Sequence, residues 1–340
     1  MKAVALFGVG DIRVVEKEIP KIGDKEVLIK VGACGICGTD IHFFKGEWEV
    51  KTPLVLGHEF SGVVEKVGSK VSNIKVGDRV VAEPNIPCGE CKYCRMSERN
   101  FFCENLQATG VTIDGAFAEY VKVPAQNVYK IPDSLTLEEA ALIEPLACIV
   151  RGLDNVGIKV GSNVAIVGAG PIGLLMTQVV NYYGASRTFV IDMDDDRLKL
   201  AKELGATYTI NFKEQDPKSF VYEKTEGIGV DVSIECVGSS AAIETAFRLA
   251  RRGGKLLIFG VAPEHDVWHV KPFELYDKEI SIFTSYRSPY TFQRAVEVAS
   301  SGKIKLKPII SHIYSLDEAP KAFNELASRK KGMIKVLLKP

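Results

Sequence analysis

The sequence predicts an α/β protein of two domains. Short valine-rich runs bounded by Gly, Pro, Asp or Asn fill residues 1–130 and indicate antiparallel strands. From Asn163 onward, helical patterns alternate with continuous apolar strand patterns, which is typical of a parallel, doubly wound sheet. At 340 residues, the chain is also too long for one ordinary hydrophobic core.

The composition is that of a globular protein, and it limits the kinds of partner that the chain can be expected to bind. It is 46% hydrophobic and 25% charged, and its 43 basic and 43 acidic residues give a formal net charge of zero. No basic arm argues for nucleic acid, no apolar run has membrane-spanning length, and the N-terminus shows no signal-peptide pattern. We therefore expect a cytoplasmic protein that binds neither nucleic acid nor membranes. Disulfides are unexpected there, so clustering among the eight cysteines indicates metal binding.

The first domain reads as a small, irregular barrel of antiparallel strands, and one of its segments carries zinc-ligand chemistry. Residues 34–59 contain Cys37, His58 and Glu59, and thiolate, imidazole and carboxylate are ligands of zinc. A catalytic zinc keeps three protein ligands and one open position. We take Cys37 and His58 as two ligands and leave the third open between Glu59 and Glu144. Alone, such a cysteine and histidine are equally consistent with core packing.

Four further cysteines follow the spacing C-x2-C-x2-C-x8-C. Four thiolates at such spacing can close a tetrahedral shell with no open position, which is the mark of a structural zinc. An iron–sulfur cluster is the competing interpretation, and a disulfide pair is the third. The four residues are Cys88, Cys91, Cys94 and Cys103.

A helix is expected near residues 136–156, because Thr136-x-x-Glu139 forms a capping box before an apolar run. Glu144 lies among apolar residues of this helix, where a carboxylate is costly unless it is paired or bound to metal. We favour a role in the site for Glu144; the alternative is an exposed helix acid.

The segment NVAIVGAGPIGLLMTQVV reads as a strand, a glycine turn and a helix. In G-x-G-x-x-G, the first glycine permits the turn, the second lets a pyrophosphate approach, and the third lets helix pack on strand. The helix N-terminus then presents free amides to the phosphates. The predicted cofactor-binding residues of this turn are Gly168, Gly170, Pro171, Ile172 and Gly173.

Asp192 ends the next predicted strand and is placed to accept a hydrogen bond from a ribose 2′-hydroxyl. Its charge would repel a 2′-phosphate, which favours NAD over NADP. Arg197 weakens that preference slightly, since an arginine nearby can serve a phosphate, and we count it among the cofactor-binding residues. The alternative is that Asp192 caps the next helix.

A metal with an open position beside a dinucleotide site indicates alcohol chemistry. The metal acts as a Lewis acid toward a hydroxyl, and the carbinol hydrogen leaves as hydride to the nicotinamide. Thr39, two residues after Cys37, and His42, five after it, are predicted to relay the proton outward. The alternatives are that Thr39 caps the Cys37 turn and that His42 is a surface residue.

The motifs GICGTDIH, GHEFSGVVEKVG, IEPLAC and VGAGPIG, together with the four-cysteine lobe, resemble the zinc-dependent medium-chain dehydrogenase/reductase family, which includes the alcohol dehydrogenases. The resemblance covers essentially the whole chain. It implies a GroES-like catalytic domain over 1–146 with a zinc lobe at 88–103, and a Rossmann NAD-binding domain over 147–285. It implies that residues 286–340 return to the first domain. It also implies one catalytic and one structural zinc, the Thr39–His42 relay, and a homodimer or homotetramer.

Within the family, a glutamate at position 144 is similar to the sorbitol, threonine and sugar-acid dehydrogenase branches. Arg287 stands where polyol-type relatives carry an arginine near the substrate; a surface arginine at a hinge is the alternative. We therefore expect oxidation of a secondary hydroxyl of a polyol or sugar acid to a ketone. L-threonine or a small secondary alcohol is the alternative substrate. A non-catalytic NAD- or zinc-binding protein is the alternative class.

Overall fold

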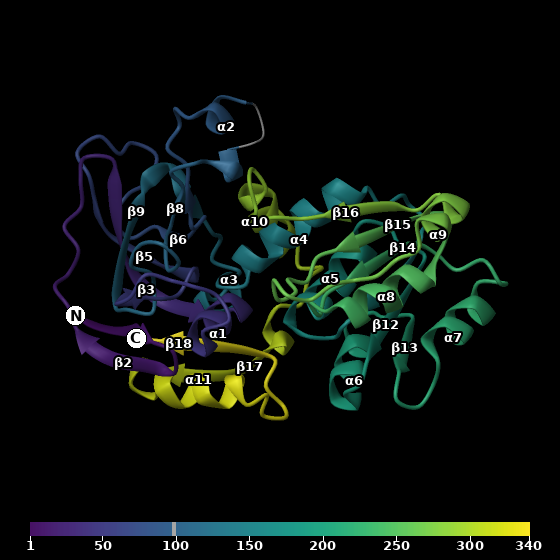
Figure 1. Ribbon diagram of the computed structural model, residues 1–340. Helices are drawn as coiled ribbons and strands as arrows, with labels where there is room; N and C mark the ends of the chain where they lie inside the picture. Colours follow the sequence, from purple (N-terminus) through teal and green to yellow (C-terminus); the bar gives the residue numbers. More distant parts are fainter. Residues whose placement is uncertain (97–99) are drawn as a thin grey trace. The chain divides into compact units, whose positions relative to one another are not determined.

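The computed structural model describes residues 1–96 and 100–340 and divides the chain into two compact units (Figure 1). Unit 1 comprises Met1–Ala147, Ser288–Gly302 and Leu306–Pro340. Unit 2 comprises Cys148–Arg287 and Lys303–Lys305. The chain therefore leaves unit 1 after Ala147 to build most of unit 2, returns at Ser288, and enters unit 2 again only for Lys303–Lys305. None of the helices described is long and apolar enough to cross a membrane.

Unit 1 is built on strands that are mostly antiparallel. Its largest sheet has the strand order β10-β6-β5-β3-β18-β17, and β9 also pairs with β3. These strands are β3 (Glu26–Gly35), β5 (Glu59–Val67), β6 (Arg79–Ala82), β9 (Tyr120–Pro124), β10 (Val128–Lys130), β17 (Ile310–Ser315) and β18 (Lys335–Lys339). A second sheet has the order β2-β1-β4, and β7 pairs with β8. They span β1 (Lys2–Gly8), β2 (Asp11–Glu16), β4 (Leu54–Val55), β7 (Asn85–Ile86) and β8 (Gln107–Ala108).

The helices of unit 1 are short. They are α1 (Gly38–Lys45), α2 (Lys92–Arg95), α3 (Leu137–Ala140), α10 (Phe292–Ser300) and α11 (Ala319–Ala327), with the 3₁₀ turns η1 (Asn100–Phe102), η2 (Ala125–Asn127), η3 (Lys307–Ile309) and η4 (Leu316–Glu318). A longer helix, α4 (Ile143–Val156), begins in unit 1 and ends in unit 2.

The single helix expected over 136–156 is two helices in the structure. Thr136 and Glu139 form the predicted capping box at the start of α3. The chain then turns at residues 141–142 before α4 begins. Pro145 gives a physical reason for the break, because it has no N–H to donate to the carbonyl of residue 141 and is tolerated only in the first turn of a helix.

The C-terminal segment is part of the core of unit 1. Strand β18 pairs with β3 through Leu337–Gly35 and Leu338–Cys34. The ring of Phe323 on α11 packs at 5.9 Å from that of Phe117, between their centroids. Burial of such apolar surface stabilises the unit by about 25 cal/mol per Å². The segment from η4 onward is therefore integral to the core that surrounds β3.

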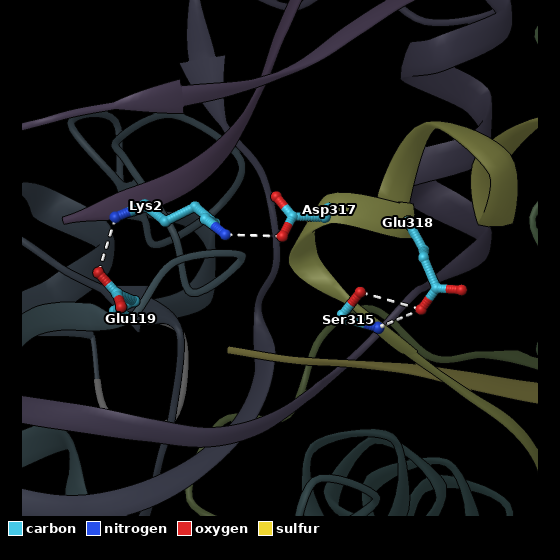
Figure 2. Close-up of polar contacts among 5 residues, drawn as sticks. All are labelled: Lys2, Glu119, Ser315, Asp317 and Glu318. Atoms are coloured by element: carbon cyan, nitrogen blue, oxygen red, sulfur yellow. Dashed lines mark hydrogen bonds and ion pairs between the residues drawn. The ribbon is translucent and has the colours of Figure 1, made fainter.

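Polar contacts also tie this segment to the first strand (Figure 2). The ammonium group of Lys2 on β1 donates to Asp317 of η4 at 2.7 Å, while the backbone N–H of Lys2 donates to Glu119 at 2.7 Å. Ser315 and Glu318 form a capping box that begins η4. These contacts are exposed or half-buried, so they orient the segment more than they stabilise it.

Unit 2 is a six-stranded parallel sheet with the order β13-β12-β11-β14-β15-β16. Its strands are β11 (Asn163–Val167), β12 (Arg187–Asp192), β13 (Tyr208–Asn211), β14 (Val230–Glu235), β15 (Ala250–Ile258) and β16 (Ser281–Thr284). Its remaining helices are α5 (Pro171–Tyr182), α6 (Asp195–Glu203), α7 (Pro217–Lys224), α8 (Ser240–Leu249) and α9 (Pro272–Lys278). The predicted doubly wound parallel sheet is confirmed. The strand order reverses between β11 and β14, and ligands of such sheets bind at that point.

Candidate functional site

Three predicted zinc ligands come together in unit 1. The ligand atoms of Cys37, His58 and Glu59 all lie within 4.8 Å of one another. Pairing of β3 with β5 sets Gly35 opposite Glu59, so Cys37, two residues beyond β3, meets the start of β5. Gly57 makes the approach possible: its φ is +96°, and a Cβ there would lie 2.8 Å from the backbone nitrogen of Phe117.

Two members of the cluster are buried and Cys37 is half-buried, and the three groups are chemically suited to zinc. His58 is 6% exposed and Glu59 is 2% exposed. Nδ1 of His58 is buried without a hydrogen-bond partner and lies 3.7 Å from Oδ1 of Asp40. A thiol, an imidazole and a carboxylate at this separation fit a zinc ion with one open position.

Asp40 is a buried acid that supports this cluster. It is fully buried, and its Oδ2 accepts a hydrogen bond from the backbone N–H of Cys37 at 2.8 Å. Its Oδ1 lies 3.7 Å from Nδ1 of His58. Burial raises the pKa of Asp40 to about 6, although His58 opposes the rise. A carboxylate beside a metal-binding histidine fixes the orientation of the imidazole ring.

His58 experiences opposing influences. Burial lowers its pKa, but the charges of Cys37, Asp40 and Glu144 outweigh burial and leave the pKa well above its ordinary value. An anionic environment of this kind attracts a cation, whether a proton or a metal ion.

Lys335 pairs with the same cluster from the last strand of the chain. Its ammonium group contacts Oε2 of Glu59 and donates to the carbonyl of Ile36 at 3.0 Å. The side chain is 5% exposed. Burial lowers the pKa of Lys335, whereas Glu59 and Cys37 raise it, and the net direction is upward. The lysine is thus held as a cation beside a ligand carboxylate.

Glu144 lies in the first turn of α4 and is not a member of the described three-residue cluster. Its charge nevertheless raises the pKa of both His58 and Glu83. Glu144 is therefore electrostatically close to the site, while Glu59 is the carboxylate that lies within ligand distance of Cys37 and His58.

The predicted relay residues both lie on α1. Thr39 and His42 are three residues apart and so share one face of this helix. Nδ1 of His42 contacts the carboxylate of Glu47, and its ring stacks on Trp48 with a centroid distance of 4.4 Å. The side chain of His42 is 25% exposed, so it can exchange protons with solvent.

The four cysteines of the lobe also converge. Their sulfur atoms lie within 4.8 Å of one another, and all four are free thiols. Sγ of Cys88 and Sγ of Cys94 are 3.9 Å apart, far longer than a disulfide bond. Backbone N–H groups, that of Cys94 first, lower the pKa of Cys91 to about 6. The thiolate that a metal requires is thus favoured at Cys91, whereas burial raises the pKa of Cys94 to about 12. The lobe also contains residues 97–99, which lie outside the described part of the chain.

The glycine turn joins β11 to α5 in unit 2. Gly168 has φ +103°, and a Cβ on Gly173 would lie 1.8 Å from the carbonyl oxygen of Gly168. Around Gly170 the space is open within 4 Å. Pro171 begins α5, and Ile172 follows it. The turn thus has the close packing and the open face that a pyrophosphate needs.

Asp192 braces this turn. Its Oδ2 accepts from the N–H of Ala169 at 2.6 Å, and its Oδ1 accepts from Met193 at 2.7 Å and from Asp194 at 3.0 Å. The cap of α6 is Asp194, which accepts from Asp196 and Arg197. Helix capping therefore does not explain Asp192. Arg197 itself lies in the first turn of α6.

Arg287 ends the main segment of unit 2. It adopts a left-handed backbone with φ +62°, and its guanidinium lies 4.4 Å from the ring centroid of Tyr286. A positive φ at a residue other than glycine is uncommon and marks a tight turn in the chain.

Sequence reasoning missed Asp40 and Lys335. Asp40 had a local signal, since an acid three residues after a helix cap belongs to the first turn. The only local signal for Lys335 is weak: it is a charged residue inside the apolar strand pattern IKVLLK. Nothing local to that strand indicates which other strand it pairs with.

Two family models match the chain. The model of the alcohol dehydrogenase GroES-like domain matches residues 23–133. The model of the zinc-binding dehydrogenase matches residues 171–301. The first match contains Cys37, His58 and the lobe, and the second contains the start of α5 and Asp192.

Individual relatives match over nearly the whole chain. The sorbitol dehydrogenase of Bacillus subtilis (strain 168) is 37% identical over 100% of this chain and 97% of its own length. The L-threonine 3-dehydrogenase of the same strain is 39% identical over 96% of this chain and 94% of its own length. A solved zinc-binding dehydrogenase of Sinorhizobium meliloti 1021, bound to NADP, has a TM-score of 0.96 and 40% identity, covering 100% of this chain and 99% of its own.

Proposed function

Because the chain belongs to the zinc-dependent medium-chain dehydrogenase/reductase family, we propose that it transfers hydride from a secondary hydroxyl of a polyol or sugar acid to NAD, giving a ketone. The coarser activity, that of a zinc-containing alcohol dehydrogenase, follows from family membership. The observation that carries the proposal is the buried Cys37–His58–Glu59 cluster in a chain that also carries a dinucleotide-type turn.

In this proposal, Cys37 and His58 hold a catalytic zinc together with a carboxylate from Glu59 or Glu144. The distances favour Glu59. When bound, the metal supplies a Lewis acid that polarises a hydroxyl group. Asp40 orients His58 through its second oxygen, which lies 3.7 Å from the imidazole.

Thr39 and His42 take the hydroxyl proton outward. Thr39 is half-buried beside Cys37, whereas His42 reaches solvent and contacts Glu47. The order from the half-buried hydroxyl of Thr39 to the partly exposed imidazole of His42 to the exposed carboxylate of Glu47 supports a path from the site to water.

The cofactor of this proposal is NAD. The carboxylate of Asp192, at the end of β12, supports it because a 2′-phosphate would meet a negative charge there. The Sinorhizobium meliloti neighbour is bound to NADP, so both cofactors belong in the test. We further propose a second, structural zinc on Cys88, Cys91, Cys94 and Cys103, and assembly as a homodimer or homotetramer.

The substrate class rests on Glu144 and on the sorbitol dehydrogenase relative. A second candidate is L-threonine, favoured by the 39% identity to the threonine dehydrogenase. Arg287 is proposed as a substrate contact, since a guanidinium can pair with a hydroxyl-rich or carboxylate-bearing substrate.

The deciding experiment is NADH formation, followed by absorbance, with NAD and a panel of polyols, aldonates, L-threonine and simple secondary alcohols. NADP is run in parallel, and bound metal is counted. A rate on a polyol or aldonate supports the proposal, and a rate on threonine alone replaces the substrate class. The absence of any rate from protein with two zinc ions would favour a non-catalytic NAD- or zinc-binding role. The Cys37→Ser variant, which should give no rate, excludes a contaminating enzyme.

A further inference from the structure

Glu235 is a fully buried carboxylate at the carboxyl end of β14. It stands in register with Val167 of β11 on one side and with Ile258 of β15 on the other. Glu235 therefore lies at the edge of the sheet where β11 leads into the glycine turn, at the point where the strand order reverses. Nothing in the proposed chemistry uses this side chain.

Two successive N–H groups converge on one oxygen of Glu235. Oε1 accepts from Val237 at 2.5 Å and from Gly238 at 2.6 Å. The carbonyl of Glu235 accepts from Phe259 and Gly260, each at 3.0 Å. Glu235 thus holds the loop after β14 through its side chain and the loop after β15 through its backbone.

The two loops touch closely at glycines. Gly238 has φ +82°, and a Cβ there would lie 2.4 Å from the carbonyl oxygen of Val261. A Cβ on Gly260 would lie 2.3 Å from the nitrogen of Gly238 and 2.8 Å from Oε2 of Glu235. Backbone therefore packs on backbone, and neither glycine has room for a side chain.

The loop after β14 also packs on the glycine turn. Cγ2 of Val237 lies 2.7 Å from where a Cβ on Gly168 would be, and the N–H of Cys236 donates to the carbonyl of Val167 at 2.9 Å. Val237 is 57% exposed, so one face of this loop is open while Glu235 anchors the other. The position of Val237 against Gly168 thus depends on the anchor.

The two sides of this edge have different neighbours. Asp192 lies at the end of β12, on the adenosine side of the glycine turn. The ends of β14 and β15 lie on the other side of β11, where the second half of a dinucleotide extends. We propose that Glu235 is a positioning residue that holds residues 236–239 and 259–261 in the shape that receives the nicotinamide ring of NAD. This inference rests on the proposed function.

The carboxylate is suited to this task because one buried oxygen satisfies two backbone donors. Removing it leaves the partly buried N–H groups of Val237 and Gly238 without their acceptor, so the loop loses the contact that holds it. Burial raises the pKa of Glu235, although the backbone N–H donors act in the opposite direction. Because burial disfavours the negative charge, a neutral amide is a close substitute for this side chain. Glu235→Gln keeps an oxygen at the same reach, whereas Glu235→Asp is one methylene too short.

The experiment compares NADH with ADP-ribose, which carries every part of the cofactor except the nicotinamide ring, by calorimetric titration of the full-length metal-loaded protein. For Glu235→Ala we expect the Kd of NADH to rise about tenfold or more, while the Kd of ADP-ribose changes less than about twofold. Glu235→Gln should bind both like the wild type, and Glu235→Asp should behave like Glu235→Ala. The Gln variant thus separates the role of the side-chain oxygen as a hydrogen-bond acceptor from the role of the negative charge.

Asp231→Ala is the matched control. Asp231 lies on the same strand, near its opposite end, and also has two partners, the N–H of Asn163 at 2.8 Å and the side chain of Arg251 at 2.7 Å. Its loss should lower the melting temperature without changing the ratio of the two Kd values. If Glu235→Ala does not fold, Glu235→Asp and Glu235→Gln carry the comparison.

Equal affinity of wild type and the Ala or Asp variant for NADH would overturn the inference. Parallel loss of NADH and ADP-ribose would overturn it too, because it would show a general weakening of unit 2. Failure of the wild type itself to bind either ligand would instead contradict the proposed function.

Discussion

Lys335 and Glu59 form a buried ion pair between the last strand of the chain and the candidate metal cluster. Nζ of Lys335 contacts Oε2 of Glu59, and the two side chains are 5% and 3% exposed. A buried carboxylate without a partner is costly, and Glu59 also lies within 4.8 Å of Cys37 and His58. The pair therefore links folding of the C-terminal segment to the charge balance of the cluster.

Replacing Lys335 by Met should destabilise the protein by about 3–5 kcal/mol, because it leaves the charge of Glu59 buried and unpaired. Urea titration measures the loss. Lys339→Met is the matched control on the same strand, since Lys339 pairs with Glu138 while 44% exposed and should cost only about 0–1 kcal/mol. Adding Glu59→Gln to Lys335→Met should recover part of the stability. If both lysine variants lost an equally small amount of stability, the proposed contribution of the buried ion pair to folding would be contradicted.

Cys37→Ser should remove one of two bound zinc ions and abolish turnover, while NADH still binds, because the glycine turn lies in a separate unit. Elemental analysis and fluorescence titration of NADH measure the two effects. Cys91→Ser should remove the other ion and lower the melting temperature, since a four-thiolate zinc contributes directly to folding. Turnover by a Cys37→Ser protein with one fewer metal ion would exclude the zinc mechanism.

Asp192→Ala should weaken NAD binding roughly tenfold to a hundredfold, since a hydrogen bond from the ribose to a charged group is lost. NADP binding should weaken much less, because the repulsion of its 2′-phosphate is relieved as well. Asp192→Asn controls for the brace on the glycine turn, since its amide oxygen can still accept the N–H of Ala169. Calorimetry with both cofactors decides, and equal losses of NAD and NADP would be incompatible with a role in cofactor choice.

Glu83 should make stability depend on pH. Burial, with a further contribution from Glu144, raises its pKa from 4.5 to about 8. A folded-state pKa above the unfolded one gives stability that is complete below about pH 4.5 and is lost as the pH rises toward 8. The free energy of unfolding of Glu83→Gln, relative to that of its parent, should therefore be higher at pH 8.5 than at pH 5. The expected difference is on the order of a few kcal/mol.

This comparison is best made on the Cys37→Ser background, where no metal charge acts on Glu144. Thermal unfolding across the pH range measures it. Glu65→Gln, at an exposed position of β5, serves as the control and should follow its parent at every pH. If the difference in stability between Glu83→Gln and its parent did not vary with pH, the raised pKa of Glu83 in the folded protein would be contradicted.

The sequence alone was sufficient for family membership and for the two-unit α/β architecture, both of which are confirmed. Local spacing explains this success. The turn around Gly168 and Gly173 lies between a strand and a helix that are contiguous in the chain, so its geometry is encoded within a few residues. Cys88, Cys91 and Cys94 are likewise near neighbours, and their spacing alone permits convergence.

Tertiary structure decided the contacts that join distant strands. Lys335 reaches Glu59 only because β18 pairs with β3, and Glu235 meets Phe259 and Gly260 only because β14 and β15 end side by side. Strand pairing of this kind depends on burial of whole sheet faces and on loop closure over long stretches of chain, which no local pattern records. The sequence by itself determined which chemical groups the site contains. The fold decided which of them are buried together. Burial makes the pairing of Asp40, Lys335 and Glu235 important for stability, because an unpaired polar group costs most free energy where water is excluded.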